Sequence, residues 1–370
     1  MEINILNRNT ISAEEIEKSA SESAPALDDL WASEWINASI THADEKLAEE
    51  LTSIADEIAE VSDIVVVAAD GKTAKSIKAA LALTEDVDAR PEVIVFGDTL
   101  STEDYGELIS KLRDKRASLL AVAAEKESLQ FTGAYTILKK LIISSGAGAE
   151  LADRIYAICS GKSTLVAKDC AENDYPVVWL SDKADSLYLA NTAAALLPLL
   201  IKGVSLEEYL KGFYEIVSAP DWDINATIYS WKRAEFEKNT ENPKVNYMCW
   251  QREFFDVAKW LESFDSETEK RVLFMPEDEY LAKDRENNFD VLLGADESLT
   301  DIMTPFFEGC GEDGSLALLT KETADRKFFG EDRKSDGFKI ELNQLDDFAA
   351  GRVMAFLQIS EAIVTYLTNK

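Results

Sequence analysis

A chain of 370 residues with 46% hydrophobic side chains and seven tryptophans is long enough to form two or three domains with apolar cores. Its formal net charge of −32 argues against nucleic acid and anionic membranes as partners, because both are bound by a basic face. The same charge means that an anionic ligand needs a local positive pocket inside a repelling outer field.

No targeting or membrane-spanning segment is predicted. The opening residues, MEINILNRNTISAEE, lack the basic and apolar regions of a signal peptide, and the apolar run 187–201 is too short to cross a bilayer. The four cysteines have no CxxC spacing, so a cytoplasmic protein with reduced thiols is predicted. One histidine and unpatterned cysteines offer no metal-ligand constellation, and we expect neither a metal nor a cofactor.

Residues 1–62 are predicted to form an N-terminal helical segment. Helices are expected over 13–20 and 44–60, where apolar residues recur at helical spacing in the second. His42 lies just before the second helix. A single histidine at that place is more typical of a capping or surface residue than of a catalyst.

From residue 63 to 218 the pattern alternates between short apolar runs and amphipathic helices. Strands are predicted at 64–69, 93–97, 119–124, 155–160 and 177–180, and helices at 73–83, 102–115, 129–143, 164–173 and 187–202. This order is typical of an α/β domain built on a doubly wound, five-stranded parallel sheet with right-handed crossovers.

The stretch SAPDWDIN marks a break near residue 219, and residues 219–370 are predicted to form a second, smaller α/β domain. Helices are expected near 226–238 and 252–264. Short strands are expected at 272–276, 291–294, 316–320 and 338–342. A long C-terminal helix over 346–369 closes the chain, with one apolar stripe.

Two turns imitate the end of a phosphate-binding P-loop. Gly71-Lys72-Thr73 and Gly161-Lys162-Ser163 each follow a predicted strand and open a helix. The motif also needs an earlier glycine, and Val66 and Tyr156 stand at those positions. A single phosphate at such a helix start stays open as one interpretation. An ordinary turn with exposed lysines is the other.

The turn 125–128 joins the strand 119–124 to a helix beginning at Leu129, which is where open α/β sheets place ligands. Lys126, Ser128 and the free N–H groups of the helix start would attract an anion there. Glu125 and Glu127 would repel one. We expect this turn to lie at the edge of the binding site.

The stretch 107–141, ELISKLRDKRASLLAVAAEKESLQFTGAYTILKKL, resembles the sugar-isomerase (SIS) phosphosugar-binding module of glucose-6-phosphate isomerases. Further stretches are similar to that family in the expected order, at 64–81, 184–203, 260–274 and 338–364. The resemblance implies two SIS-like α/β domains, a sugar-phosphate ligand and a homodimer.

The resemblance also implies site residues. Phosphate contacts fall on Gly71, Lys72, Thr73, Lys126 and Ser128, although the turn keeps only one of the family's hydroxyls. The family's catalytic glutamate falls on Ser266, and the neighbouring Glu267 is the candidate for its role. The family's arginine falls on Leu187, and its ring-opening histidine has no counterpart.

Three functions follow from this pattern. The chain is expected to be a glucose-6-phosphate isomerase-like protein of carbohydrate metabolism, in glycolysis and gluconeogenesis, which would interconvert glucose 6-phosphate and fructose 6-phosphate if active. That aldose–ketose isomerisation needs a proton-shuttling carboxylate and groups that stabilise an oxyanion, most of which are replaced here. The alternatives are a non-catalytic sugar-phosphate-binding or regulatory protein, and a different enzyme that uses Lys72 and Lys126.

Overall fold

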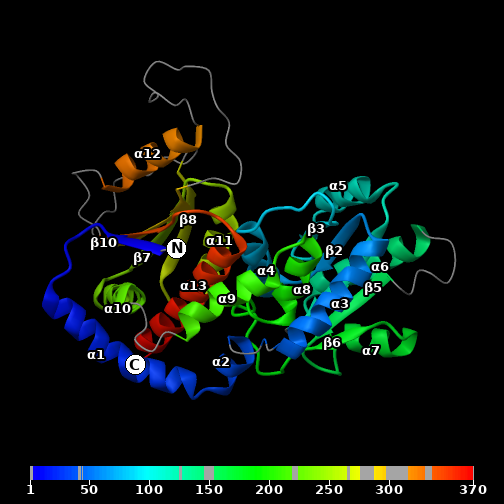
Figure 1. Ribbon diagram of the computed structural model, residues 1–370, viewed down its shortest axis with the longest axis horizontal. Coiled ribbons are helices and arrows are strands. Elements are labelled where there is room, and N and C mark those ends of the chain that lie inside the picture. The colour runs from blue at the N-terminus through cyan, green and yellow to red at the C-terminus, as the bar shows by residue number, and fades with distance from the viewer. Residues whose placement is uncertain are drawn as a thin grey trace. The chain divides into compact units, whose positions relative to one another are not determined.

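The computed structural model describes residues 3–40, 43, 45–124, 127–145, 154–218, 224–264, 267–275, 287–296, 316–329 and 336–369. Contacts divide the chain into two compact units, each with one five-stranded sheet (Figure 1). The mid-chain unit comprises Ser33–Leu81 and Glu85–Glu207, and the terminal unit comprises Met1–Ala32, Ala82–Thr84 and Glu208–Lys370. Met1–Ala32 therefore groups with the C-terminal residues, while the predicted domain limits at 62 and 218 stay a prediction.

The sheet of the mid-chain unit is parallel throughout. Its strand order is β3-β2-β4-β5-β6, and its strands are β2 (Ile64–Ala68), β3 (Glu92–Phe96), β4 (Ala117–Ala123), β5 (Ile155–Cys159) and β6 (Val177–Trp179). The three central strands are buried along their whole length, as expected for strands covered on both faces. The predicted doubly wound, five-stranded parallel sheet is confirmed.

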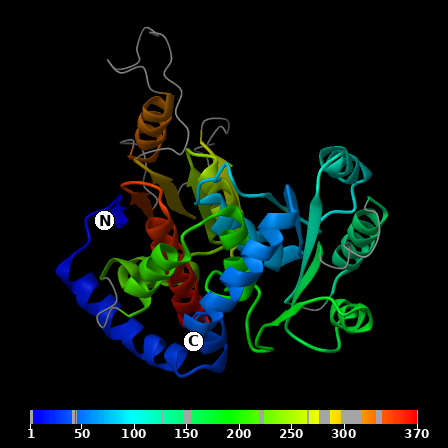
Figure 2. The same ribbon diagram turned by 45° about the vertical axis from the view of Figure 1, so that its right-hand side comes forward.

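Helices cover both faces of this sheet. The helices are α2 (Glu34–Ser39), α3 (Glu45–Val61), α4 (Gly71–Ala82), α5 (Thr102–Leu112), α6 (Leu129–Ser145), α7 (Leu165–Asn173) and α8 (Ala193–Lys202). α5, α6 and α7 pack on one face through Leu108, Leu138 and Val166, and α3 lies on the other side of the strands (Figure 2). α9 (Leu206–Val217) leads into the terminal unit.

The predicted helix 187–202 is too long. The structure has successive turns before Ala193, closed by hydrogen bonds from the Tyr188 N–H to the Asp185 carbonyl and from the Thr192 N–H to the Leu189 carbonyl, each 3.0 Å. The turns are buried, so their apolar residues match a helical pattern without forming a helix.

The sheet of the terminal unit has the order β1-β10-β9-β7-β8. Its strands are β1 (Ile3–Asn7), β7 (Lys244–Cys249), β8 (Glu269–Phe274), β9 (Asn288–Ala295) and β10 (Asp336–Leu342). β1 pairs with β10 antiparallel, and the other pairs are parallel. This confirms a second α/β unit.

Two predictions for this unit are wrong, and one of its strands was missed. Residues 3–7 of the expected helical segment form a strand, which pairs antiparallel with β10. Residues 316–320 belong to a helix and not to a strand, and β7 was not predicted at all. Short apolar runs fit both periods, so only sheet neighbours decide between them.

The helices of the terminal unit are α1 (Ala13–Trp31), α10 (Ile224–Asn239), α11 (Glu253–Glu262), α12 (Leu316–Phe329) and α13 (Asp347–Thr368). α1 begins with a capping box between Ser12 and Glu15. α13 is long and apolar enough to cross a membrane by length and composition, but 83% of its most apolar window is buried in the protein. It has the burial of a core helix, and α1 and α10 both pack against it.

Candidate functional site

The candidate site lies in the mid-chain unit, where β2 and β4 end and α4, α6 and α7 begin. We call it the strand-end site and define it by Asp70, Gly71, Thr73, Glu127 and Ser128. The carboxyl ends of parallel strands meet at this edge, and the helix starts direct their free N–H groups toward it. It is therefore the place where the sequence predicts a bound phosphate.

Asp70 lies between β2 and α4 and faces the start of α6. Its side chain is nearly buried, with the residue 8% exposed, and its Oδ2 accepts a 3.4 Å hydrogen bond from the Ser128 N–H. The Ser128 hydroxyl oxygen in turn accepts the Phe131 N–H at 3.1 Å and so caps α6. The Ser128 N–H, which would meet a phosphate at this turn, is therefore already directed at a carboxylate.

Glu127 closes the neighbouring helix start. Its two carboxylate oxygens accept the N–H groups of Leu165 at 2.7 Å and Val166 at 3.0 Å. These are the first two residues of α7, where the helix dipole favours a negative charge. An intramolecular carboxylate thus stands at the point where a ligand anion would bind.

The Gly71-Lys72-Thr73 turn opens α4 without forming a loop around a ligand. Gly71 is exposed at φ +34°, and no atom lies within 4 Å of an added Cβ. Thr73 and Ser76 are completely buried one helical turn apart, and neither hydroxyl has a hydrogen-bond partner among the described residues. A tight approach at Gly97 holds β3 against β2, since an added Cβ would stand 2.5 Å from the Ala69 carbonyl oxygen.

The structure does not describe all of the predicted site residues. Lys126, Ser266 and His42 lie outside the described residues. In the second glycine turn, the Lys162 ammonium lies 5.9 Å from the Trp179 ring centroid. Glu267 is exposed in a bend before β8 in the terminal unit. The structure therefore groups Asp70, Gly71, Thr73 and Ser128 in the mid-chain unit, and Glu267 belongs to the terminal unit.

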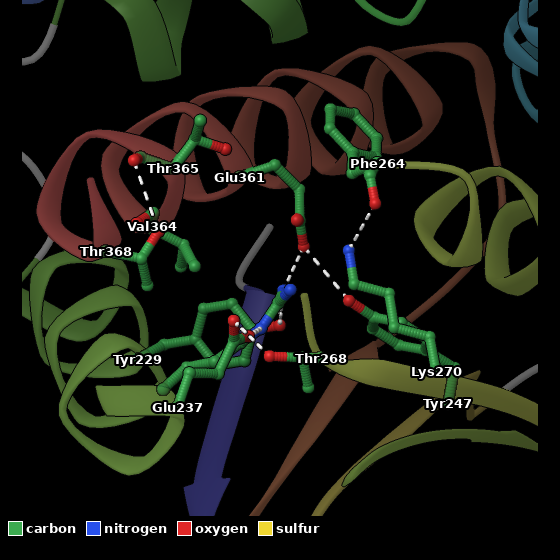
Figure 3. Close-up of polar contacts among 11 residues, drawn as sticks. Tyr229, Glu237, Tyr247, Phe264, Thr268, Lys270, Glu361, Val364, Thr365 and Thr368 are labelled. Atoms are coloured by element: carbon green, nitrogen blue, oxygen red, sulfur yellow. Dashed lines mark hydrogen bonds and ion pairs between the residues drawn. The ribbon is translucent and has the colours of Figure 1, made fainter. Parts of the chain in front are cut away.

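The terminal unit contains a buried polar cluster that sequence reasoning missed (Figure 3). Arg233 of α10 lies at its centre, and its Nε donates to Glu237 at 3.0 Å. Another guanidinium nitrogen forms an ion pair with Glu361 of α13, which also accepts the Tyr247 hydroxyl at 3.2 Å. The Thr268 hydroxyl, next to Glu267, donates to Glu237 at 2.9 Å. The cluster joins α10, α13, β7 and the start of β8.

Burial and charge set the protonation of this cluster. Burial raises the pKa of Tyr229 to about 12 and that of Tyr247 well above its usual range. Burial alone would lower the pKa of Arg233, but Glu361 and the two tyrosines raise it well above its ordinary value. The guanidinium is therefore permanently charged and both phenols stay protonated, so the cluster acts as a fixed connection and not as a proton relay.

No metal centre accompanies these groups in the described part of the chain, where no three or more His, Cys, Asp or Glu side chains gather around a possible ion. The polar cluster could have been suspected from the i, i+4 spacing of Arg233 and Glu237. Its decisive partner, Glu361, is 128 residues away in the chain and carries no local signal.

Comparison with known proteins adds to this geometry. No family model matches the chain. The glucose-6-phosphate isomerase of Leptospira interrogans is 22% identical over 219 residues, which are 58% of this chain and 46% of that protein. In sequence, this chain is glucose-6-phosphate isomerase-like. It spans about half the length of the curated relatives it matches.

Solved structures show the same fold. A hypothetical protein of Thermus thermophilus superposes with a TM-score of 0.80 at 15% identity, covering 96% of this chain and 91% of that one. A glucose-6-phosphate isomerase of Chlamydia trachomatis gives a TM-score of 0.75 at 11% identity, covering 99% and 84%. The predicted glucose-6-phosphate isomerase-like, SIS-type fold is confirmed.

Proposed function

We propose that this glucose-6-phosphate isomerase-like protein of carbohydrate metabolism keeps the phosphosugar-binding fold but does not interconvert glucose 6-phosphate and fructose 6-phosphate. The supporting observation is the closure of the strand-end site by Asp70 and Glu127, whose carboxylates accept the N–H groups of two helix starts. This chain spans about half the length of its curated relatives, so their activity does not by itself imply that this chain is active.

The energies of repulsion and attraction at the strand-end site favour closure over phosphate binding. Two like charges 4 Å apart near a protein surface repel each other by about 4 kcal/mol. A helix N-terminus attracts an anion by only about 0.3–1 kcal/mol. A phosphate at either helix start would meet a carboxylate, Asp70 at α6 or Glu127 at α7, so repulsion outweighs attraction unless that carboxylate moves away or is protonated.

The isomerisation chemistry also lacks parts. A carboxylate must shuttle a proton between two sugar carbons while a cation stabilises the enediolate oxygen. Glu267 is the remaining candidate for the carboxylate, and Leu187 stands where the family has its arginine. The Leu187 side chain is uncharged and buried, so it cannot stabilise a negatively charged oxygen of a substrate. We infer binding or regulatory use of the fold in place of turnover.

A coupled assay with fructose 6-phosphate and with glucose 6-phosphate tests this proposal. We expect the wild-type chain to give no turnover above a Glu267→Gln variant. Turnover that disappears in Glu267→Gln would overturn the proposal and support an active isomerase with Glu267 as its base. Glu262→Gln, which changes a partly buried acid near the end of α11, is the matched control.

Opening the site tests the closure itself. In Asp70→Asn the carboxamide still accepts the Ser128 N–H, but the repelling charge is gone. We expect this variant to bind fructose 6-phosphate more tightly than the wild type in calorimetry. Equal affinity in both proteins would show that Asp70 does not close the site.

The proposal includes two further features, a homodimer, which the resemblance implies, and a cytoplasmic location, which the cysteine pattern predicts. Light scattering on the purified chain tests the first, and a mass of a single chain at all concentrations would remove it. Fractionation of the source cells tests the second.

A further inference from the structure

A basic cavity lies in the mid-chain unit at the opposite end of the parallel strands from the strand-end site, where β4 begins. It has a volume of about 540 Å³ and lies between the end of α5, the start of β4 and the end of α6. We call it the basic pocket. Its cationic lining residues are Arg113, Lys115, Arg116 and Arg154, and its apolar lining includes Leu112 and Leu141.

The local sequence creates this concentration of charge. α5 ends at Leu112, and the Lys115 N–H returns to the Leu112 carbonyl at 3.2 Å to close a tight turn. Asp114 adopts the left-handed conformation at φ 62° in that turn. Arg154 comes from the residue just before β5, which pairs with β4 in the sheet. The lining thus collects cations from two strand starts.

The cations differ in how they are neutralised. Arg116 is held by Asp63, with its Nε at 3.1 Å and a terminal nitrogen at 2.7 Å from one carboxylate oxygen. This pairing lowers the pKa of Asp63. The guanidinium groups of Arg113 and Arg154 form no ion pair or hydrogen bond with any described residue. Asp114 is the single acid among the described lining residues.

Helix-end chemistry does not account for this arrangement. A helix C-terminus attracts a cation, and Lys111 in the last turn of α5 already serves that end. Lys111 is also paired with Glu92, as expected in a chain with 70 acidic and 38 basic residues. Against that acidic excess, this cavity contains two arginines without an ion pair to any described residue, the exposed Arg113 and the half-buried Arg154, and this favours an anionic ligand.

We propose that the basic pocket binds a small organic anion with a phosphate or carboxylate group and an apolar body. The anionic group would lie between Arg113 and Arg154, whose guanidinium groups bind such oxygens with paired hydrogen bonds. The apolar body would lie against Leu112 and Leu141. The pocket supplies the local positive field that an acidic chain needs to hold an anion, and it lies at the other end of the strands from Asp70 and Glu127.

Calorimetry on the full chain with three probes tests this site. Phenyl phosphate carries both features, inorganic phosphate lacks the apolar body, and benzoate exchanges the phosphate for a carboxylate. We expect phenyl phosphate to bind more tightly than inorganic phosphate, and the benzoate arm tells which anionic group is preferred. Arg113→Gln and Arg154→Gln should each lower the affinity for phenyl phosphate about tenfold, a change that calorimetry resolves.

Lys168→Gln is the matched control, because Lys168 is an exposed cation of α7 that lines a different groove. It should leave the affinity unchanged. Equal affinity in the two arginine variants and in Lys168→Gln, with circular dichroism showing all three folded, would overturn the proposal, as would no heat from any probe at millimolar concentration. Asp70→Asn should not alter phenyl phosphate binding at this pocket, so failure here is distinguishable from failure of the proposed function.

Discussion

Carboxylates have different roles in two parts of this protein: at one place they repel an anion, and at the other they hold a buried cation. At the strand-end site, Asp70 and Glu127 accept backbone N–H groups, and their charge repels any further anion. In the cluster of the terminal unit, Glu237 and Glu361 hold a buried guanidinium. The donors make the difference, since an N–H group is neutral and Arg233 is charged.

The comparison separates two roles of a carboxylate: blocking a binding site, which we call closure, and stabilising the fold, which we call cohesion. Removing a carboxylate from a helix start leaves neutral N–H groups without that acceptor, and the expected loss of stability is modest. A charge removed from the polar cluster leaves its partner uncompensated in the interior, and that costs far more. Variants at the two places should therefore differ several-fold in their effect on stability.

The largest effect is expected for Arg233→Met. Arg233 is 1% exposed, and its removal leaves Glu237 and Glu361 without their cation. We expect the free energy of unfolding to fall by about 3–5 kcal/mol, measured by urea denaturation of the full chain. Arg326→Met, at an exposed position of α12, should change it by no more than about 0.5 kcal/mol.

A smaller effect is expected for Glu127→Ala. The N–H groups of Leu165 and Val166 lose their acceptor. The free energy of unfolding should therefore fall by about 0.5–2 kcal/mol, as for other helix N-terminal acceptors. Glu172→Ala removes an exposed acid from the other end of α7 and should stay within about 0.5 kcal/mol. Equal losses in the two variants would show that Glu127 does not support the helix.

Urea midpoints of Asp70→Asn, Glu127→Ala and the wild type then sharpen the contrast with Arg233→Met. If a strand-end variant lost as much stability as Arg233→Met, the distinction between closure and cohesion would fail. A gain of sugar-phosphate affinity together with a small loss of stability is the combined result that the strand-end geometry predicts.

The sequence predicted one half of this comparison in outline. The apolar runs of β2, β4 and β5 indicated the parallel sheet, and the turn 125–128 was placed at its edge with Glu127 as a repelling charge. That Glu127 reaches α7 could not be foreseen, because the contact joins residues 38 positions apart. The polar cluster depends on Arg233 and Glu361, and nothing along the chain pairs them.

The smallest effect concerns a partly exposed counterpart of the buried carboxylate–cation pairs. Glu15 of α1 accepts the Ser12 N–H at 2.8 Å and lies 2.8 Å from Lys232. The hydrogen bond with Lys232 is the largest cause that lowers its pKa from 4.5 to about 2, followed by those with Ser12. Because the folded pKa is the lower one, Glu15 stabilises the fold above pH 4.5, and this contribution is lost as the pH falls toward 2.

Solvent screens this pair, since the Glu15 side chain is 35% exposed. We therefore expect the contribution to stay below about 1 kcal/mol, unlike that of the buried cluster. Urea denaturation of the wild type and Glu15→Gln at pH 7 and near pH 3 measures it, and the gap between the two proteins should narrow at the lower pH. A gap that is constant with pH would mean that the Glu15 charge contributes nothing, and that burial is what makes a carboxylate–cation pair matter here.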